Sequence, residues 1–233
     1  MQPEVNIIMV SRDLWDMTKK ALETLIFTMS QPWRLIFVNN GSTDGTREGF
    51  EKIAPTWAWQ HFQGYQIHHY KRPVSLAAAW NKAWGMAEQN ARYTLFANND
   101  IVFHQYGWWD QFQELLDGGM DLAGIQDMTW HRFRFIEGSL FAAKTGTFKA
   151  MEESGKLFDT RFKLSCEDVD LSERFKRAGL KIGQVHGLQP EYLVHIGHQT
   201  LQNFGPTEDL ISKMNASRKA LCKKWGYPVK VED

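Results

Sequence analysis

The sequence predicts an α/β fold, a mostly parallel central sheet flanked by helices, in a single domain over residues 1–233. Short apolar runs rich in β-branched residues alternate with segments of helical periodicity, which is typical of parallel strands joined by right-handed crossovers. A chain of 233 residues has the usual length of one α/β domain. Hydrophobic residues make up 43% and charged residues 23%, a composition that excludes disorder and coiled coils.

The first half shows the alternation most clearly. Strands are expected at residues 5–10 (VNIIMV), 34–38 (RLIFV), 66–70 and 93–97 (YTLFA), because each run is short, apolar and bounded by polar or turn residues. Helices are expected at residues 14–29, 47–53 and 76–88; Ser11 or Asp13 is available to cap the first of them. In parallel sheets, ligands bind at the carboxyl ends of the strands.

The second half is less regular. Strands are expected at residues 135–142, 181–185 and 192–195. Helices are expected at residues 108–116, 147–154, 169–178 and 208–225, with Gly179 just beyond the third of these. Because no repeat or linker separates the halves, they are expected to share one domain.

Composition and missing motifs exclude several classes of protein. The 27 basic residues balance the 27 acidic residues, so no general nucleic-acid-binding surface is expected. Two cysteines without CxxC spacing, no leader and no long apolar run predict a cytoplasmic protein without a membrane span. The GxxxxGK(S/T), GxGxxG, GxSxG and HExxH motifs are absent, which argues against P-loop NTPases, classical dehydrogenases, α/β-hydrolases and zincins.

Local clusters could still recognise a ligand. Basic residues gather at residues 71–72 and 131–134, where they could meet a phosphate. Ten Trp and fifteen Phe are a high aromatic load. Most of these rings are expected in the core, and the surplus is compatible with a groove that binds sugar rings or bases.

Asn98, Asn99 and Asp100 directly follow the apolar strand at residues 93–97. A carboxylate at the end of a strand is well placed to hold Mg²⁺ or Mn²⁺ on a phosphate, and an Asx turn is the structural alternative. Asp100 is the only charged member, so it would be the obligatory ligand. His195 follows another short apolar strand and could complete such a site, with His198 as its competitor.

An acidic run, Glu167–Asp168–Val169–Asp170, opens the predicted helix at 169–178. Acidic residues stabilise helix N-termini by capping and through the macrodipole, so a structural role is the first interpretation. The functional interpretation is a general base that accepts the proton of an attacking hydroxyl. Asp170 is expected to satisfy backbone N–H groups of the first turn, and Asp168 to point into a cleft.

Together these segments resemble the GT-A glycosyltransferases, most closely the inverting family-two enzymes with rhamnosyl- and galactofuranosyl-transferase-like sequences. The similar segments follow the family order: residues 5–11, 38–46 (VNNGSTDGT), 75–83, 95–100, 138–144 with 158–162 (FDTRF) and 167–171 (EDVDL), and finally His195.

The resemblance implies a GT-A fold and a metal-dependent inverting transfer of a sugar from a nucleoside-diphosphate sugar, expected to be a UDP-sugar, to an acceptor hydroxyl. Asp168 would be the catalytic base, and Asp100 and His195 would hold Mn²⁺ or Mg²⁺. Residues 1–102 would form the nucleotide-sugar-binding half and residues 103–233 the acceptor and catalytic half. The implied nucleotide-sugar contacts are Val10, Ser11, Arg12, Asn39, Asn40, Arg72, Asn81, Asn98 and Asn99. The implied acceptor side includes Trp130, Glu137, Gly138 and Glu167.

The sequence also departs from the family pattern. Asn39, Asn40 and Asn98 stand where the family usually has acids, which leaves the base specificity open and makes Asp100 and His195 more important. Pro73 and Ser75 replace the usual Asn and Gly. The alternatives are a sugar-1-phosphate nucleotidyltransferase and a non-catalytic nucleotide-sugar or glycan-binding module. The donor sugar, the acceptor and the oligomeric state cannot be deduced from these residues.

Overall fold

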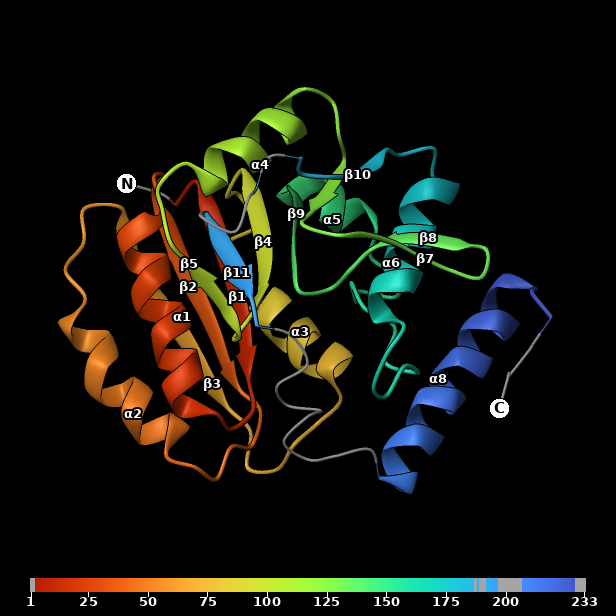
Figure 1. Cartoon of the computed structure of the whole chain (residues 1–233), viewed down its shortest axis with the longest axis horizontal. Helices are drawn as coiled ribbons and strands as arrows, with labels where there is room; N and C mark the ends of the chain where they lie inside the picture. Colours follow the sequence, from red (N-terminus) through yellow and green to blue (C-terminus); the bar gives the residue numbers. More distant parts are fainter. Residues whose placement is uncertain (1–2, 187, 189–191, 197–206, 229–233) are drawn as a thin grey trace.

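The computed structural model describes residues 3–186, 188, 192–196 and 207–228. Its centre is a seven-stranded sheet with the order β10-β6-β9-β4-β1-β2-β3 (Figure 1). The strands are β1 (Val5–Ser11), β2 (Trp33–Asn39), β3 (Phe62–His69), β4 (Tyr93–Asn98), β6 (Leu122–Gly124), β9 (Leu140–Lys144) and β10 (Ile182–Gln184). Only β9 runs antiparallel to its neighbours in this sheet. The predicted mostly parallel sheet is therefore confirmed.

Helices cover both faces of this sheet. The elements on one face are α1 (Trp15–Thr28), α2 (Thr46–Ile53), the short η1 (Ala54–Thr56) and α4 (Trp108–Asp117). Those on the other face are α3 (Leu76–Trp84), α5 (Thr145–Ala150) and α6 (Glu167–Arg177). Side chains alternate along β1, so Ile7 and Met9 enter the first core and Ile8 and Val10 the second. This double burial explains why the strand is a continuous apolar run.

Two small sheets and a last helix complete the fold. Strand β5 (Ile101–Phe103) pairs antiparallel with β11 (Leu193–His195), and β7 (Asp127–Trp130) pairs with β8 (Phe133–Ile136). Helix α8 (Glu208–Trp225) lies beside α6 and the β7–β8 hairpin (Figure 1). A third core cluster, which includes Phe133, Phe162, Cys166 and Leu221, joins these parts. Among the described residues, no helix is long and apolar enough to cross a membrane, and the expected cytoplasmic location stays a prediction.

The order of the strands fixes where a ligand can enter. From β1 the chain moves outward through β2 to β3, and then β4 returns to the other side of β1. The direction of winding therefore reverses between β1 and β4. Open α/β sheets bind ligands in the crevice outside the carboxyl ends of the strands at such a reversal.

Several predicted elements have different bounds in the structure. The strand expected at 135–142 is two strands, β8 and β9, because a turn at Glu137 to Ser139 interrupts it. The helix expected at 76–88 ends at Trp84, because the backbone of Glu88 turns away to bond the side chain of Asn6. Helix α6 begins at Glu167, two residues earlier than expected.

The expected cap of α1 is also wrong. Neither Ser11 nor Asp13 caps this helix; instead, the backbone nitrogen of Trp15 donates to Asp44 Oδ2 over 2.8 Å. The other oxygen of Asp44 accepts from the backbone nitrogen of Thr46. Asp13 makes the reverse connection, since its Oδ1 accepts from the backbone nitrogen of Thr43 over 2.7 Å. The loops after β1 and β2 are thus tied to each other.

Candidate functional site

The carboxyl ends of β1, β2 and β4 bring the first group of candidate residues together. Val10 is opposite Asn98 in the ladder between β1 and β4, and Ser11 is opposite Asn39 in the ladder between β1 and β2. Asn99 and Asp100 follow β4 directly and are buried. Polar residues therefore end the strands where the direction of winding reverses, as the sequence predicts.

Asparagine amides hold this edge in one arrangement. Asn40 pairs with the backbone of Val74 through both amide atoms, over 3.0 and 2.9 Å. Asn99 Nδ2 donates to Ser11 Oγ and Thr18 Oγ1. Asn39 Oδ1 accepts from the backbone nitrogen of Ser42, so the donors of its amide stay available to a ligand. The loops around the crevice are thereby fixed before any ligand enters.

Two arginines lie at the mouth of the edge, and both are exposed: Arg12 follows β1, and Arg72 precedes α3. The loop that carries Arg72 packs closely on Gly41, whose φ is +70°. A Cβ at Gly41 would lie 2.5 Å from the backbone nitrogen of Pro73, so this turn requires glycine.

Asn81 does not point freely into the crevice. Its Nδ2 donates to the Phe158 carbonyl over 2.7 Å, and its Oδ1 accepts from the Phe158 nitrogen over 2.9 Å. This amide ties α3 to the segment that precedes α6. A nucleotide-sugar contact by Asn81 would require these bonds to break.

Asp100 and His195 meet at the start of the β5–β11 sheet. His195 is paired with Ile101, and the backbone nitrogen of Ile196 donates to the Asp100 carbonyl. Asp100 Oδ1 and His195 Nε2 are 3.3 Å apart, and both are buried without a hydrogen-bond partner among the described residues. Burial lowers the pKa of His195, but the carboxylates of Asp100 and Glu137 outweigh it and raise the pKa overall.

This donor set fits a divalent cation. Carboxylate oxygen and imidazole nitrogen both bind Mn²⁺, and a bound ion would satisfy these two buried ligand atoms, which lie 3.3 Å apart. The competing His198 lies outside the described residues.

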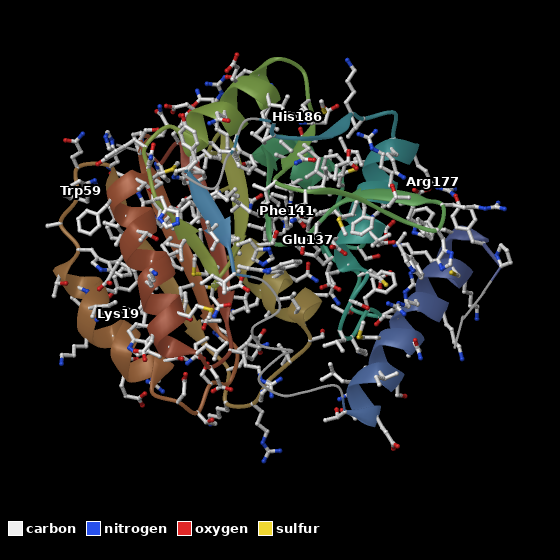
Figure 2. All side chains as sticks on the ribbon, in the orientation of Figure 1. Lys19, Trp59, Glu137, Phe141, Arg177 and His186 are labelled. Carbon is white, nitrogen blue, oxygen red and sulfur yellow. The ribbon has the colours of Figure 1, made fainter. Side chains whose placement is uncertain are left out.

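The turn between β8 and β9 links this pair to the acidic run. The backbone nitrogen of Asn98 donates to the Ser139 carbonyl over 2.8 Å, which joins the turn to the end of β4. The backbone nitrogen of Gly138 donates to Asp168 Oδ2 over 3.0 Å. Glu137 lies between the central sheet and α6 (Figure 2), and its charge acts on both His195 and Asp168. Three neighbouring residues thus connect the two halves of the candidate site.

Asp168 is a half-buried carboxylate in the first turn of α6. Its Oδ1 accepts from the backbone nitrogen of Val169 over 2.8 Å. Burial raises the pKa of Asp168 to about 6, with the charge of Glu137 adding to the rise and the backbone N–H groups of Val169 and Gly138 opposing it. The neighbouring Glu167 is buried beside Asp168, and its pKa is raised further, mainly by burial. A carboxylate tuned towards neutral pH can accept a proton from a hydroxyl.

Asp170 has a different role from the expected helix cap. It is fully buried, and it accepts from Lys224 Nζ, Arg174 Nε and Trp225 Nε1. Lys224 also contacts Glu153 at 2.9 Å and Asp159 at 3.3 Å. These three carboxylates lie close enough to suggest a metal site, but the ammonium of Lys224 contacts all three, and Arg161 and Arg174 pair with Asp159 and Asp170. Asp170 therefore fastens α8 to α6.

The tryptophans that the sequence suggests for sugar stacking lie in different parts of the fold. Trp108 and Trp109 are fully buried in the core. Trp130 is half-buried at the end of β7, where its ring stacks on Phe133 at 5.9 Å. It belongs to the cluster between the hairpin and α8.

The sequence matches the model of glycosyl transferase family 2 over residues 6–152. The chain belongs to glycosyl transferase family 2. The matched range includes the ends of β1, β2 and β4 and the β8–β9 turn. No protein with a curated description matches the sequence.

Solved structures agree with a family-two GT-A fold. The mannosyltransferase PcManGT from Pyrobaculum calidifontis, in complex with GDP-Man and Mn²⁺, superposes with a TM-score of 0.64 at 12% identity, covering 98% of this chain and 77% of that one. S. aureus TarS 1–349, in complex with UDP-GlcNAc, has a TM-score of 0.59 at 13% identity, covering 98% and 76%. At such low identity these neighbours establish the fold.

Some residues around this candidate site are not predicted from the sequence. Ser139 holds the end of β4, and the indole of Trp80 packs against Gly138. Lys224 pairs with Asp170 behind the start of α6. For Ser139, the Glu–Gly–Ser run at 137–139 is a sequence signal for a turn. The other two are long-range contacts, which local periodicity does not reveal.

Proposed function

We propose that this family-two glycosyltransferase transfers a sugar from a UDP-sugar to an acceptor hydroxyl with inversion and with the help of a divalent cation. The observation that carries the proposal is the β8–β9 turn. It bonds Asp168 through Gly138 and the end of β4 through Ser139, so a base and a cation site would face one crevice. Residues 1–102 would supply the donor side and residues 103–233 the acceptor and catalytic side.

The nucleotide would lie outside the carboxyl ends of β1, β2 and β4. The Asn39 amide would bond the base, and the main chain around Val10 and Ser11 would line its pocket. Arg12 and Arg72 would approach the diphosphate, and Asn98 and Asn99 would border the sugar. The fixed amides of the edge support this placement, because a preformed pocket loses little ordering entropy on binding.

Asp100 and His195 would hold the cation, Mn²⁺ or Mg²⁺. When bound, the cation neutralises the negative charge that develops on the departing diphosphate. The solved mannosyltransferase of similar fold, in complex with GDP-Man and Mn²⁺, supports the use of a divalent cation. Glu137 adds negative charge beside His195, which favours a bound cation further.

Asp168 would accept the proton of the acceptor hydroxyl. The hydroxyl oxygen would form the new bond to the anomeric carbon as the bond from that carbon to the diphosphate oxygen breaks on the opposite face. One in-line displacement inverts the anomeric configuration. The bonds from Gly138 and Val169 fix the Asp168 carboxylate, so its free lone pairs face a constant direction. Trp130, Glu137 and Glu167 would border the acceptor.

The first experiment compares UDP, GDP, CDP and dTDP in a thermal-shift assay with Mn²⁺ or with EDTA. We expect UDP to raise the melting temperature most, and more with Mn²⁺ than with EDTA. Asp100→Ala and His195→Ala should remove the Mn²⁺-dependent part, whereas the exposed Asp209→Ala should keep it. UDP binding that is equal in EDTA would refute the metal assignment, and loss in His198→Ala alone would move the imidazole ligand by three residues.

The second experiment separates the alternatives. With a UDP-sugar, the enzyme should release UDP, and NMR of the transferred sugar should show inverted anomeric configuration. A nucleotidyltransferase would instead consume UTP and a sugar 1-phosphate and release pyrophosphate. A pure binding module would bind UDP-sugars and release nothing. The family match favours the first outcome.

A further inference from the structure

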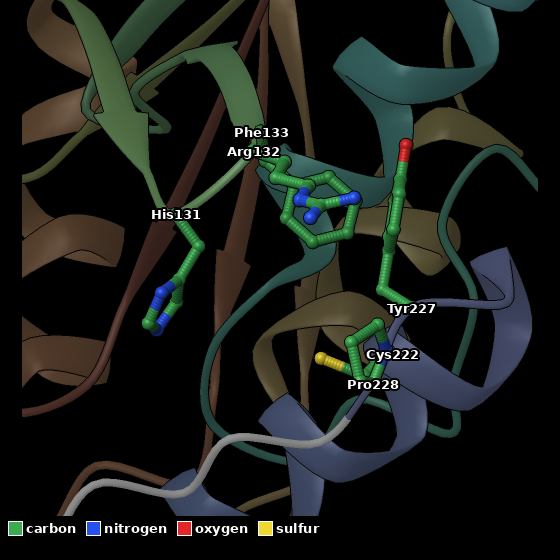
Figure 3. Close-up of a pocket in the computed structure, with 6 residues that line it drawn as sticks. All are labelled: His131, Arg132, Phe133, Cys222, Tyr227 and Pro228. Atoms are coloured by element: carbon green, nitrogen blue, oxygen red, sulfur yellow. The ribbon is translucent and has the colours of Figure 1, made fainter.

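A cavity of about 310 Å³ opens between the turn of the β7–β8 hairpin and the C-terminal end of α8 (Figure 3). Its walls are formed by His131, Arg132, Phe133, Cys222, Tyr227 and Pro228. None of these residues lies at the carboxyl ends of β1, β2 and β4, where the donor is proposed to bind. Small-molecule sites start at roughly 300 Å³, so the cavity has room for a monosaccharide with one substituent.

Aromatic rings build the apolar part of this cavity. Phe133 is almost fully buried and meets Tyr227 edge to face, with 4.9 Å between the ring centres. Trp130 also stacks on Phe133, and the guanidinium of Arg218 lies 5.6 Å from the Trp130 ring. Tyr227 keeps a partly exposed face. Sugar rings pack their C–H faces on such rings because these faces are apolar.

The polar part of the cavity is cationic. Arg132 is exposed and has no ion-pair or hydrogen-bond partner among the described residues. The nearby Arg134 is different, because Asp127 holds it in a salt bridge. His131 stands beside Arg132 on the wall, and none of the described residues that line the cavity is acidic. A free guanidinium next to an aromatic face is suited to an anionic group.

The cavity shares its support with the proposed catalytic base. Phe133 forms one core cluster with Cys166 and Val169. These two residues flank Glu167 and Asp168 in the sequence. The cavity wall and the start of α6 are therefore parts of one packed unit on the acceptor half of the chain.

We propose that this cavity binds the anionic substituent, a phosphate or a carboxylate, of a saccharide acceptor, with the sugar ring on Tyr227 and the anion on Arg132. The proposal rests on the proposed function, since it names the substrate class of the second half of the same enzyme. The donor has its own proposed place at the carboxyl ends of β1, β2 and β4, where Arg12 and Arg72 are exposed.

The test measures sugar binding by saturation-transfer NMR. Glucose, galactose and mannose are compared with their 6-phosphates and with glucuronate, galacturonate and mannuronate. We expect at least one charged sugar to bind about tenfold more tightly than its neutral counterpart, because charge-assisted hydrogen bonds have that strength. The phosphate and uronate arms distinguish the two sources of the charge.

Arg132→Ala should abolish the preference for charged sugars, and Tyr227→Ala should weaken neutral and charged sugars alike. Arg47→Ala, an exposed arginine on α2, should keep the wild-type preference. Equal binding of neutral and charged sugars, or equal loss in Arg132→Ala and Arg47→Ala, overturns the proposal. UDP binding by the wild type is measured separately, so a chain that binds charged sugars but no nucleotide would refute the donor assignment and leave the cavity assigned.

Discussion

The backbone nitrogen of Gly138 donates to Asp168 Oδ2 over 3.0 Å, and the absence of a side chain at Gly138 makes this approach possible. A Cβ at Gly138 would lie 3.3 Å from both Cβ and Oδ2 of Asp168 and 3.2 Å from the Trp80 ring. A methyl group at Gly138 would therefore press on the carboxylate to which the backbone of Gly138 is hydrogen-bonded. The position of the carboxylate depends on that of the turn.

Gly138→Ala should lower the turnover number with little change in donor affinity, because the added methyl group displaces the Asp168 carboxylate. Misplacement of about 1 Å can cost roughly 100-fold in rate, so the shift of a few tenths of an ångström that these contacts require should cost a smaller factor. Steady-state kinetics and UDP titration measure the two effects. Gly146→Ala is the matched control, since a Cβ there meets nothing within 4 Å and the residue lies in helix α5. A Gly138→Ala enzyme with normal turnover would show that the contact does not position the base.

Asp168→Asn should reduce the transfer rate by about 10²–10⁴-fold and keep donor affinity, as expected for loss of a general base. Asp170→Asn should instead destabilise the fold, because Lys224 and Arg174 would lose their buried counter-charge. Donor affinity, melting temperature and transfer rate are measured on both variants. A well-folded, inactive Asp170→Asn enzyme beside an active Asp168→Asn enzyme would exchange the two roles.

The transfer rate should rise with pH until Asp168 is ionised. Burial raises the pKa of Asp168 to about 6, so the base is protonated and inactive below that pH and active above it. Glu137→Gln removes a negative charge that adds to this rise, and the inflection should move to lower pH. The pH profile of kcat, measured for both enzymes, tests this. An unmoved inflection would separate Glu137 from the base.

The same pKa affects stability with a definite sign. A carboxyl group whose folded pKa is raised favours the folded state in its neutral form, and this contribution is lost as the pH rises through the folded value. The melting temperature of Asp168→Asn, relative to that of the wild type, should therefore be higher at pH 8 than at pH 5. Melting temperatures at both pH values check this. A relative melting temperature that is higher at pH 5 would contradict the assigned direction of the pKa shift.

Lys224→Met should destabilise the protein by about 3–5 kcal/mol, since it removes the buried partner of Asp170 and Asp159. Urea denaturation gives the free energy of unfolding. Lys213→Met on the same helix removes only an exposed pair with Asp209 and should have a much smaller effect. Similar losses in both variants would mean that Lys224 contributes no more than a surface charge.

The sequence predicts the sheet well where strands are long and apolar. The runs that became β1, β2 and β4 are buried on both faces, so their composition alone is diagnostic. Strands β5 and β6 span three residues each, and β7 four. Such segments are too short to show a period, and they exist because a partner strand is close. The formation of these strands depends on pairing with strands elsewhere in the fold.

The residues of the candidate site also divide into those that local sequence predicts and those that depend on long-range contacts. Asp100 and Asp168 were identifiable because an acid directly follows a strand or opens a helix. The hydrogen bonds between Asn81 and Phe158 and between Asp44 and Trp15 were not identifiable, because each joins residues that are 29 or more positions apart in the sequence. Asp170 was expected to cap its own helix, but its partner lies 54 residues further along. Sequence patterns report local roles, and these three side chains act at long range.

The pairing of β5 with β11 has a consequence for the order of assembly. Asp100 lies near the middle of the chain, and His195 reaches it only through a strand made of residues 193–195. During synthesis, the sheet edge that would receive the nucleotide can form long before this strand leaves the ribosome. Closing so large a loop is slow, so this strand would join late. A nascent chain would therefore form the carboxyl ends of β1, β2 and β4 first and bring Asp100 and His195, the proposed cation ligands, together last.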